Sequence, residues 1–202
     1  MADFIIYSGI AALAAYLLGS LNGALLMSRF LLGDDIRKHG SGNAGATNVL
    51  RTYGVKWSIL VSVWDVSKGV LAVLLGSRLI PEEYYGGLIV GFFVILGHVF
   101  PIFFGFRGGK GVITSCAVLF ALDWQTAAIA LGLFMVIVVI TRYVSLGSVC
   151  AMLTLPALGA LFNRGVPLIM MYAALAVLVI LLHRANIKRL FAGTENKFGK
   201  KK

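Results

Sequence analysis

The chain has 202 residues, of which 59% are hydrophobic and only 13% are charged, and its mean hydropathy is +0.93. A soluble domain usually carries about 25% charged residues, so this composition excludes an ordinary water-soluble protein. The net charge of +10 would suit nucleic-acid binding in a soluble chain. In a chain this apolar we instead read it as the positive-inside bias of a membrane protein and as a site for anions, with no nucleic-acid partner.

Apolar runs long enough to cross a bilayer define the expected fold, because a spanning helix needs about 20 mainly apolar residues. We predict an all-α, polytopic transmembrane helix bundle that forms a single domain over residues 1–202. The fourth run has 12 residues and is expected to be short or re-entrant, buried among the others. The seven predicted spans are Phe4–Ser28, Val55–Ser77, Tyr84–Phe106, Gly111–Leu122, Trp124–Thr141, Tyr143–Asn163 and Gly165–His183.

Positive charges gather on one side of this topology. Fifteen Lys and Arg residues, Lys200, Lys201 and Lys202 among them, fall in segments on one side, and two, Arg78 and Arg164, fall on the other. Because basic residues mark the cytoplasmic side, we predict an outer N-terminus and a cytoplasmic C-terminus. The elaborate polar, glycine-rich segments also fall on the basic side, which indicates a site there.

The first of these segments is rich in glycine, hydroxyl and amide groups. Its residues Gly40–Gly45 match GxGxxG, but no strand precedes them, so a dinucleotide site is not indicated. Glycine backbone N–H groups can still converge on an anion, and Arg51 offers a fork suited to phosphate oxygens. The alternative is a turn that only caps the second span. The candidate ligands are Ser41, Gly42, Asn43, Gly45, Thr47, Asn48 and Arg51.

A second polar segment places Lys110 among glycines at the start of the fourth predicted span. It is not a Walker A loop, because Gly111 follows the lysine where Ser or Thr is needed. A lysine beside backbone amides at a helix N-terminus can nevertheless hold a phosphate. The alternative is a basic loop that only sets the topology, a role that fits Arg107 equally well. The candidates here are Gly108, Gly109, Lys110 and Gly111.

Later segments add further candidates. Arg142 and Ser145 follow the fifth span, and His183 and Asn186 are three residues apart, so they share a face if the last helix continues. Inside the second span, Asp65 and Lys68 are also three apart, and we predict a buried structural pair near the site. Neither Cys116 nor Cys150 has a second Cys or His at ligand spacing, so no metal site is predicted.

Together these motifs resemble one family, the bacterial acyl-phosphate-dependent glycerol-3-phosphate acyltransferases. The resemblance extends from about Gly19 to Glu195, with several motifs in the same order. The matching positions are Ser28-Arg29, Asp35-Ile36-Arg37, Gly40–Asn43, Gly45–Asn48, Arg51, Gly97-His98, Pro101, Phe106, Gly108–Gly111, Thr141–Ser145, His183, Asn186-Ile187, Arg189-Leu190, Gly193 and Glu195.

The resemblance implies an enzyme of the bacterial inner membrane whose active site faces the cytoplasm. It would transfer a fatty acyl group from acyl phosphate to the 1-hydroxyl of glycerol 3-phosphate. The products would be lysophosphatidic acid and phosphate, in the first acylation of phospholipid synthesis. No cofactor or metal is implied, the partners are the two substrates and the lipid bilayer, and a monomer is expected. Ser41, Arg51, Lys110, His183 and Asn186 are the expected catalytic residues, and the other candidates are expected to bind phosphate.

The base is left open between two groups. Acyl-CoA acyltransferases of the HxxxxD type are excluded, because Ala44, Phe103 and Lys188 stand five residues after the three histidines. Either His183 or a phosphate of the substrate takes the hydroxyl proton. We favour the phosphate, with His183 as a binding or orienting group.

Two rival functions fit the sequence less well. An anion transporter would be expected to show paired repeats and a site open to both faces, and the sequence has neither feature. A CDP-alcohol phosphotransferase would need several spaced aspartates for metal, whereas the predicted cytoplasmic segments hold only Asp34 and Asp35.

Overall fold

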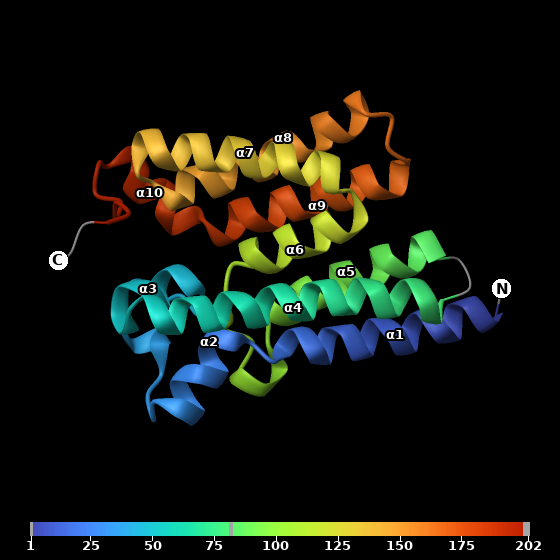
Figure 1. The fold of residues 1–202 in the computed structure, drawn as a ribbon, viewed down its shortest axis with the longest axis horizontal. Coiled ribbons are helices and arrows are strands. Elements are labelled where there is room, and N and C mark those ends of the chain that lie inside the picture. Colours follow the sequence, from blue (N-terminus) through green and yellow to red (C-terminus); the bar gives the residue numbers. More distant parts are fainter. Residues whose placement is uncertain (1, 81–82, 200–202) are drawn as a thin grey trace. The chain divides into compact units, whose positions relative to one another are not determined.

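The computed structural model describes residues 2–80 and 83–199, and those residues form helices and connections with no strand (Figure 1). The predicted all-α class is therefore confirmed. Lys200, Lys201 and Lys202, which we counted toward the cytoplasmic charge, lie outside the described residues. The chain divides into two compact units, Met1–Leu122 and Asp123–Lys202. The single domain over residues 1–202 stays a prediction.

Unit 1 is built on three long helices, and α1 packs closely on α5. A Cβ atom on Gly97 would collide with the backbone of Tyr16 and Ser20, and one on Gly19 would collide with the backbone of Val94. Glycine at these positions lets the two backbones touch, as small residues do in membrane bundles. The elements are α1 (Ala2–Ser20), α2 (Gly23–Leu26), a π-helical turn (Met27–Leu31), a 3-10 turn (Ile36–Lys38), α3 (Ala46–Tyr53), α4 (Val55–Leu79), α5 (Glu83–Val99), a 3-10 turn (Ile102–Phe104) and α6 (Val112–Leu122).

Unit 2 consists of α7 (Trp124–Thr141), α8 (Val144–Leu161), α9 (Val166–Leu182) and the short α10 (Arg184–Phe191). Helix α8 packs against both α7 and α9. Helix α10 leaves α9 at a bend of 61° located at His183. One end of the unit, where α7 begins, is fixed by Asp123, whose carboxylate receives two 2.8 Å bonds from Arg164 and one of 2.9 Å from the Tyr172 hydroxyl.

Five helical segments of the described residues are long and apolar enough to cross a membrane, and a sixth if α9 and α10 count as one bent span. The fifth predicted span, Trp124–Thr141, coincides with α7. The fourth is confirmed as a short helix, because α6 has 11 residues. Since α6 alone is well short of a bilayer crossing, the count of seven spans stays a prediction.

The first predicted span was wrong in one respect. We expected a continuous run over Phe4–Ser28, but α1 ends at Ser20 and a new helix begins at Gly23. Asn22 caps that second helix, because its Oδ1 accepts from the Leu25 N–H at 3.1 Å. Mean hydropathy does not reveal such a break, since Leu21 and the residues after Asn22 are apolar.

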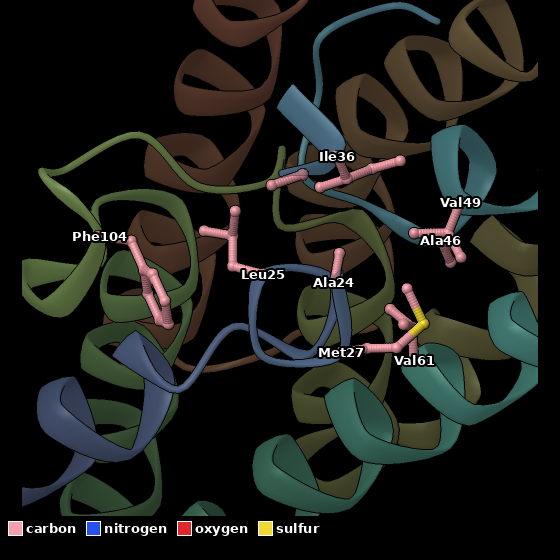
Figure 2. Close-up of a cluster of buried hydrophobic side chains, with 9 residues drawn as sticks. Ala24, Leu25, Met27, Ile36, Ala46, Val49, Val61 and Phe104 are labelled. Carbon is pink, nitrogen blue, oxygen red and sulfur yellow. The ribbon is translucent and has the colours of Figure 1, made fainter. Parts of the chain in front are cut away.

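The segment between α1 and α4 is a folded structure with its own core (Figure 2). Nine side chains, each at most 7% exposed, pack together from before, within and after the glycine-rich stretch. The segment is therefore anchored on α4 rather than free to move as a connector. The cluster comprises Ala24, Leu25, Met27, Ile36, Ala44, Ala46, Val49, Val61 and Phe104.

Candidate active site

The backbone of the first loop, Gly40–Gly45, is held in place by hydrogen bonds with the side chain of Asn48. Gly40 and Gly42 have φ angles of +56° and +71°, in the left-handed region that favours glycine. The Asn48 side-chain Oδ1 accepts from the Ser41 N–H at 2.9 Å, and its Nδ2 donates to the carbonyls of Ile36 and His39 at 3.2 and 3.0 Å. Asn48 is 1% exposed. We predicted Asn48 as a phosphate ligand, but its side chain instead stabilises the conformation of the loop.

The start of α3 follows directly on the first loop. Gly45 is its N-cap residue and has no side chain with which to cap the first N–H groups. Thr47 and Arg51 are four residues apart on α3 and so share one face. Ser41 and Arg51 are exposed, while Asn43 and Thr47 are half-buried. The helix N-terminus, the hydroxyls and the guanidinium together give this region the donors that an anion needs.

The second loop, Gly108–Gly111, lies on the end of α5. The Gly108 N–H donates to the Val99 carbonyl at 3.0 Å, and the Gly109 N–H donates to the His98 carbonyl at 3.2 Å. A Cβ atom on Gly109 would collide with Nε2 of His98 and lie 2.7 Å from the Ala44 carbonyl oxygen. Because Ala44 belongs to the first loop, the two loops touch at Gly109. Lys110 follows at once and is half-buried.

Asn22 links the first loop to the end of α5, and Arg37 links the segment before the first loop to the segment before the second. Asn22 Nδ2 donates to the Ala44 carbonyl at 3.2 Å and to the His98 carbonyl at 3.3 Å. Arg37 Nη1 donates to the carbonyls of Phe104 and Arg107 at 2.8 and 3.1 Å. Neither Asn22 nor Arg37 was predicted as a site residue. The structure therefore brings together the predicted candidates of both polar segments of unit 1. Side-chain donors that bond to backbone carbonyl groups join the two segments.

The two aspartates of the first segment are occupied in holding it. Arg37 bonds both oxygens of Asp35, and this contact keeps the pKa of that carboxyl well below its usual range. The Tyr53 hydroxyl at 2.6 Å and His39 Nε2 at 2.7 Å lower the pKa of Asp34 to about 2. Both acids are thus ionised near neutral pH. Within residues 2–80 and 83–199, no group of three His, Cys, Asp or Glu residues could hold a metal ion.

In unit 2 the predicted residues Ser145 and Asn186 meet on Glu195. Its Oε1 accepts from the Ser145 hydroxyl at 2.9 Å and from Asn186 Nδ2 at 2.7 Å, and its Oε2 pairs with Arg189 Nε at 2.7 Å. Burial alone would raise the pKa of Glu195, but these donors outweigh it and lower that pKa. We did not predict Glu195 as a site residue. The available signals were that it is one of the positions matching the family motifs and that it is the last acid of the sequence, within a strongly basic segment.

His183 lies at the bend between α9 and α10 and is 3% exposed. Its Nδ1 lies 2.8 Å from the Val179 carbonyl, which can only accept, so Nδ1 carries a proton. In the neutral ring Nε2 is then an acceptor. A neutral His183 in this tautomer cannot donate to a phosphate through Nε2, so any orienting role there is as an acceptor. Arg142 ends α7 with a φ of +62°, and its carbonyl accepts from the Phe198 N–H at 2.7 Å.

An all-helical chain with several membrane-length helices and a glycine-framed cationic site is an integral membrane protein with a candidate anion site. The model of the glycerol-3-phosphate acyltransferase family matches residues 9–193. The chain belongs to this family, and it is an acyltransferase of phospholipid biosynthesis.

Relatives and solved structures agree over nearly the whole length. The glycerol-3-phosphate acyltransferase of Thermoanaerobacter sp. is 44% identical over 96% of this chain and 98% of its own. That of Carboxydothermus hydrogenoformans is 44% identical over 96% and 97%. A crystal structure of PlsY (YgiH), an integral membrane glycerol 3-phosphate acyltransferase, in its glycerol 3-phosphate form has a TM-score of 0.89 at 36% identity, covering 95% of this chain and 96% of that one. A lysophosphatidic acid form has a TM-score of 0.85 at 34% identity, covering 95% of each.

Proposed function

We propose that this enzyme transfers a fatty acyl group from acyl phosphate to the 1-hydroxyl of glycerol 3-phosphate. The hydroxyl oxygen bonds to the acyl carbon, the bond from that carbon to the phosphate oxygen breaks, and the hydroxyl proton leaves with the phosphate. The products are lysophosphatidic acid and inorganic phosphate. The proposal draws on the related structures, whose descriptions name glycerol 3-phosphate and lysophosphatidic acid.

The observation that carries the proposal is the contact of the two glycine loops at Gly109. Both substrates present phosphate, and a phosphate needs several converging donors and positive charge. The loops offer backbone amides beside the N-termini of α3 and α6. Lys110 lies in the second loop, and Arg51 follows the first loop on α3. Hydrogen bonds to charged groups contribute about 1.5–3 kcal/mol each, so a few of them suffice to hold a substrate. Ser41, Gly42, Asn43, Gly45, Thr47, Gly108 and Gly111 complete this proposed cradle, and Asn48 maintains its shape.

For the proton we propose a phosphate of the substrate as acceptor, because its second pKa of about 6 suits that task. His183 then orients glycerol 3-phosphate through Nε2, the acceptor nitrogen of its neutral ring, by accepting from the 2-hydroxyl, whose proton is not transferred. Asn186 and Ser145 act alongside it, each already oriented by Glu195. Arg142 adds positive charge in unit 2. This assignment needs no cofactor or metal.

We further propose seven spans, an outer N-terminus, a cytoplasmic C-terminus and a monomer in the bacterial inner membrane, with the active site on the cytoplasmic side. The 15-to-2 distribution of Lys and Arg supports this orientation. A reporter active only in the cytoplasm, fused after Lys202, should be active. A silent but stably expressed fusion would reverse the orientation.

The donor is tested with the purified enzyme. Acyl phosphate and glycerol 3-phosphate together should release inorganic phosphate and form lysophosphatidic acid, whereas acyl phosphate alone should not. Acyl-CoA should give no product, because no acid stands five residues after any of the three histidines. Turnover of acyl-CoA at a comparable rate would refute the proposed donor.

A further inference from the structure

The break between α1 and α2 leaves backbone groups inside the apolar part of unit 1 without partners in their own helix. An ion pair on α4 hydrogen-bonds to such groups on both sides of the break. Lys68 Nζ donates to the carbonyls of Gly19 and Leu21 at 3.2 and 3.4 Å, at the end of α1. Asp65 Oδ1 accepts from the Gly23 N–H at 3.4 Å, at the start of α2. The cation thus faces a helix C-terminus and the anion a helix N-terminus, the favourable sign at each end.

The same ion pair extends to the second loop through His98. Lys68 Nζ lies 2.8 Å from Asp65 Oδ1 and 3.0 Å from His98 Nδ1. Nδ1 also lies 3.4 Å from Asp65 Oδ1, which can only accept, but its shorter contact is with the ammonium, which can only donate. We therefore assign Nδ1 as the acceptor and the ring proton to Nε2. That nitrogen faces Gly109, where a Cβ atom would collide with it. The side chains of Asp65, Lys68 and His98 are each at most 5% exposed, so the network is buried.

Asn22 extends the network to the first loop. Its Oδ1 caps α2, and its Nδ2 donates to the carbonyls of Ala44 and His98. The four residues Asn22, Asp65, Lys68 and His98, here called the break network, therefore contact the broken helix and both loops. Ionisable groups in a membrane interior are expensive and are retained where they serve function. Capping the broken helix would need neither His98 nor the contacts of Asn22 Nδ2 with the carbonyls of Ala44 and His98.

We propose that the break network positions the two glycine loops as a single phosphate cradle. Asn22, Asp65, Lys68 and His98 are positioning residues, which act through the loop backbone. This inference rests on the proposed function, since that proposal assigns substrate phosphate to the loops. Loosening the network should let the loops separate at Gly109 and weaken the binding of glycerol 3-phosphate.

Two variants test the inference. The double variant Asp65→Asn/Lys68→Met removes both charges together, because one remaining buried charge would destabilise the fold on its own. The variant Asn22→Ser keeps a side-chain oxygen for capping α2 and loses the Nδ2 donor. In each variant we expect the KM for glycerol 3-phosphate to rise about tenfold, with kcat nearly unchanged, as for lost uniform binding. Amide hydrogen exchange in Gly40–Gly45 and Gly108–Gly111 should become faster.

The matched control is Asp123→Asn/Arg164→Met, which removes a part-buried ion pair whose partners all belong to unit 2. It should lower the melting temperature and leave both KM and loop exchange unchanged. A folded break-network variant with unchanged KM and unchanged loop exchange would overturn the inference, as would an equal rise of KM in the control. Faster loop exchange at unchanged KM would support the positioning role and refute the loops as the substrate site.

Discussion

The two units hold their polar residues in different ways. In unit 1 the side chains of Asn22, Asn48 and His98 hold the loops by contacting their backbone, and all three side chains are buried. In unit 2 the predicted residues Ser145 and Asn186 already donate to one carboxylate, Glu195. The difference shows that a polar residue in a motif can be either a ligand or part of the scaffold, and that its hydrogen-bond partners distinguish the two.

The largest expected effect comes from changing two cations of unit 1, the exposed Arg51 and the half-buried Lys110. Arg51→Ala and Lys110→Ala should each lower kcat/KM by a factor on the order of 10² or more, because a lost electrostatic contact in a site can cost that much. Arg107→Ala is the control and should have much less effect, since Arg107 is exposed and its backbone carbonyl, not its side chain, links to Arg37. Steady-state kinetics on folded variants is the measurement. Equal losses at all three positions would mean that the loop is not specific.

Variants of His183 distinguish an orienting role from a role as the base in unit 2. If it orients the substrate by accepting from the 2-hydroxyl, His183→Gln should retain more activity than His183→Ala, because glutamine offers an acceptor oxygen. The loss in His183→Ala should then lie mainly in KM for glycerol 3-phosphate. A residue that acts as base would instead lower kcat by about 10²–10⁴. Collapse of kcat in both variants at unchanged KM would make His183 the base and exclude the substrate-assisted mechanism.

Glu195 tests whether unit 2 depends on its carboxylate for stability. Glu195→Gln removes the ion pair with Arg189 and places an amide N–H₂ or a neutral oxygen against its donors. We expect a loss of about 1–3 kcal/mol in the free energy of unfolding, the usual cost of an unsatisfied buried group. The exposed Lys188→Gln is the control and should change little. A melting temperature for Glu195→Gln equal to that of the wild type would contradict this role.

The smallest expected effect is the pH dependence that Glu195 contributes. Its pKa in the fold lies below the ordinary value of 4.5, so its contribution to stability is fully present above that value. The contribution is lost as the pH falls from there through the lowered pKa of the folded state. Thermal unfolding of Glu195→Gln should therefore depend less on pH below about 4.5 than that of the wild type. Parallel curves for the two proteins would count against the ionised carboxylate.

Much of the helical framework follows from apolar run length, as Trp124–Thr141 and the short α6 show. The predicted pairing of Asp65 with Lys68 is confirmed at 2.8 Å, because a spacing of three on a helix is local information. The break at Asn22 was missed, since the groups that satisfy it come from α4, distant in the sequence. Asn48 was predicted to bind phosphate because of its residue type alone. The residue type does not show which backbone carbonyl groups surround its side-chain amide.

The most direct test of the account is a structure of this enzyme with glycerol 3-phosphate bound. We predict the phosphate at the joined loops, with oxygens within hydrogen-bond distance of the backbone amide of Lys110 or Gly111 and of the side chain of Lys110 or Arg51. A phosphate bound elsewhere, with no contact to Gly40–Gly45, Arg51 or Gly108–Gly111, would contradict the assignment of the two loops as the substrate site.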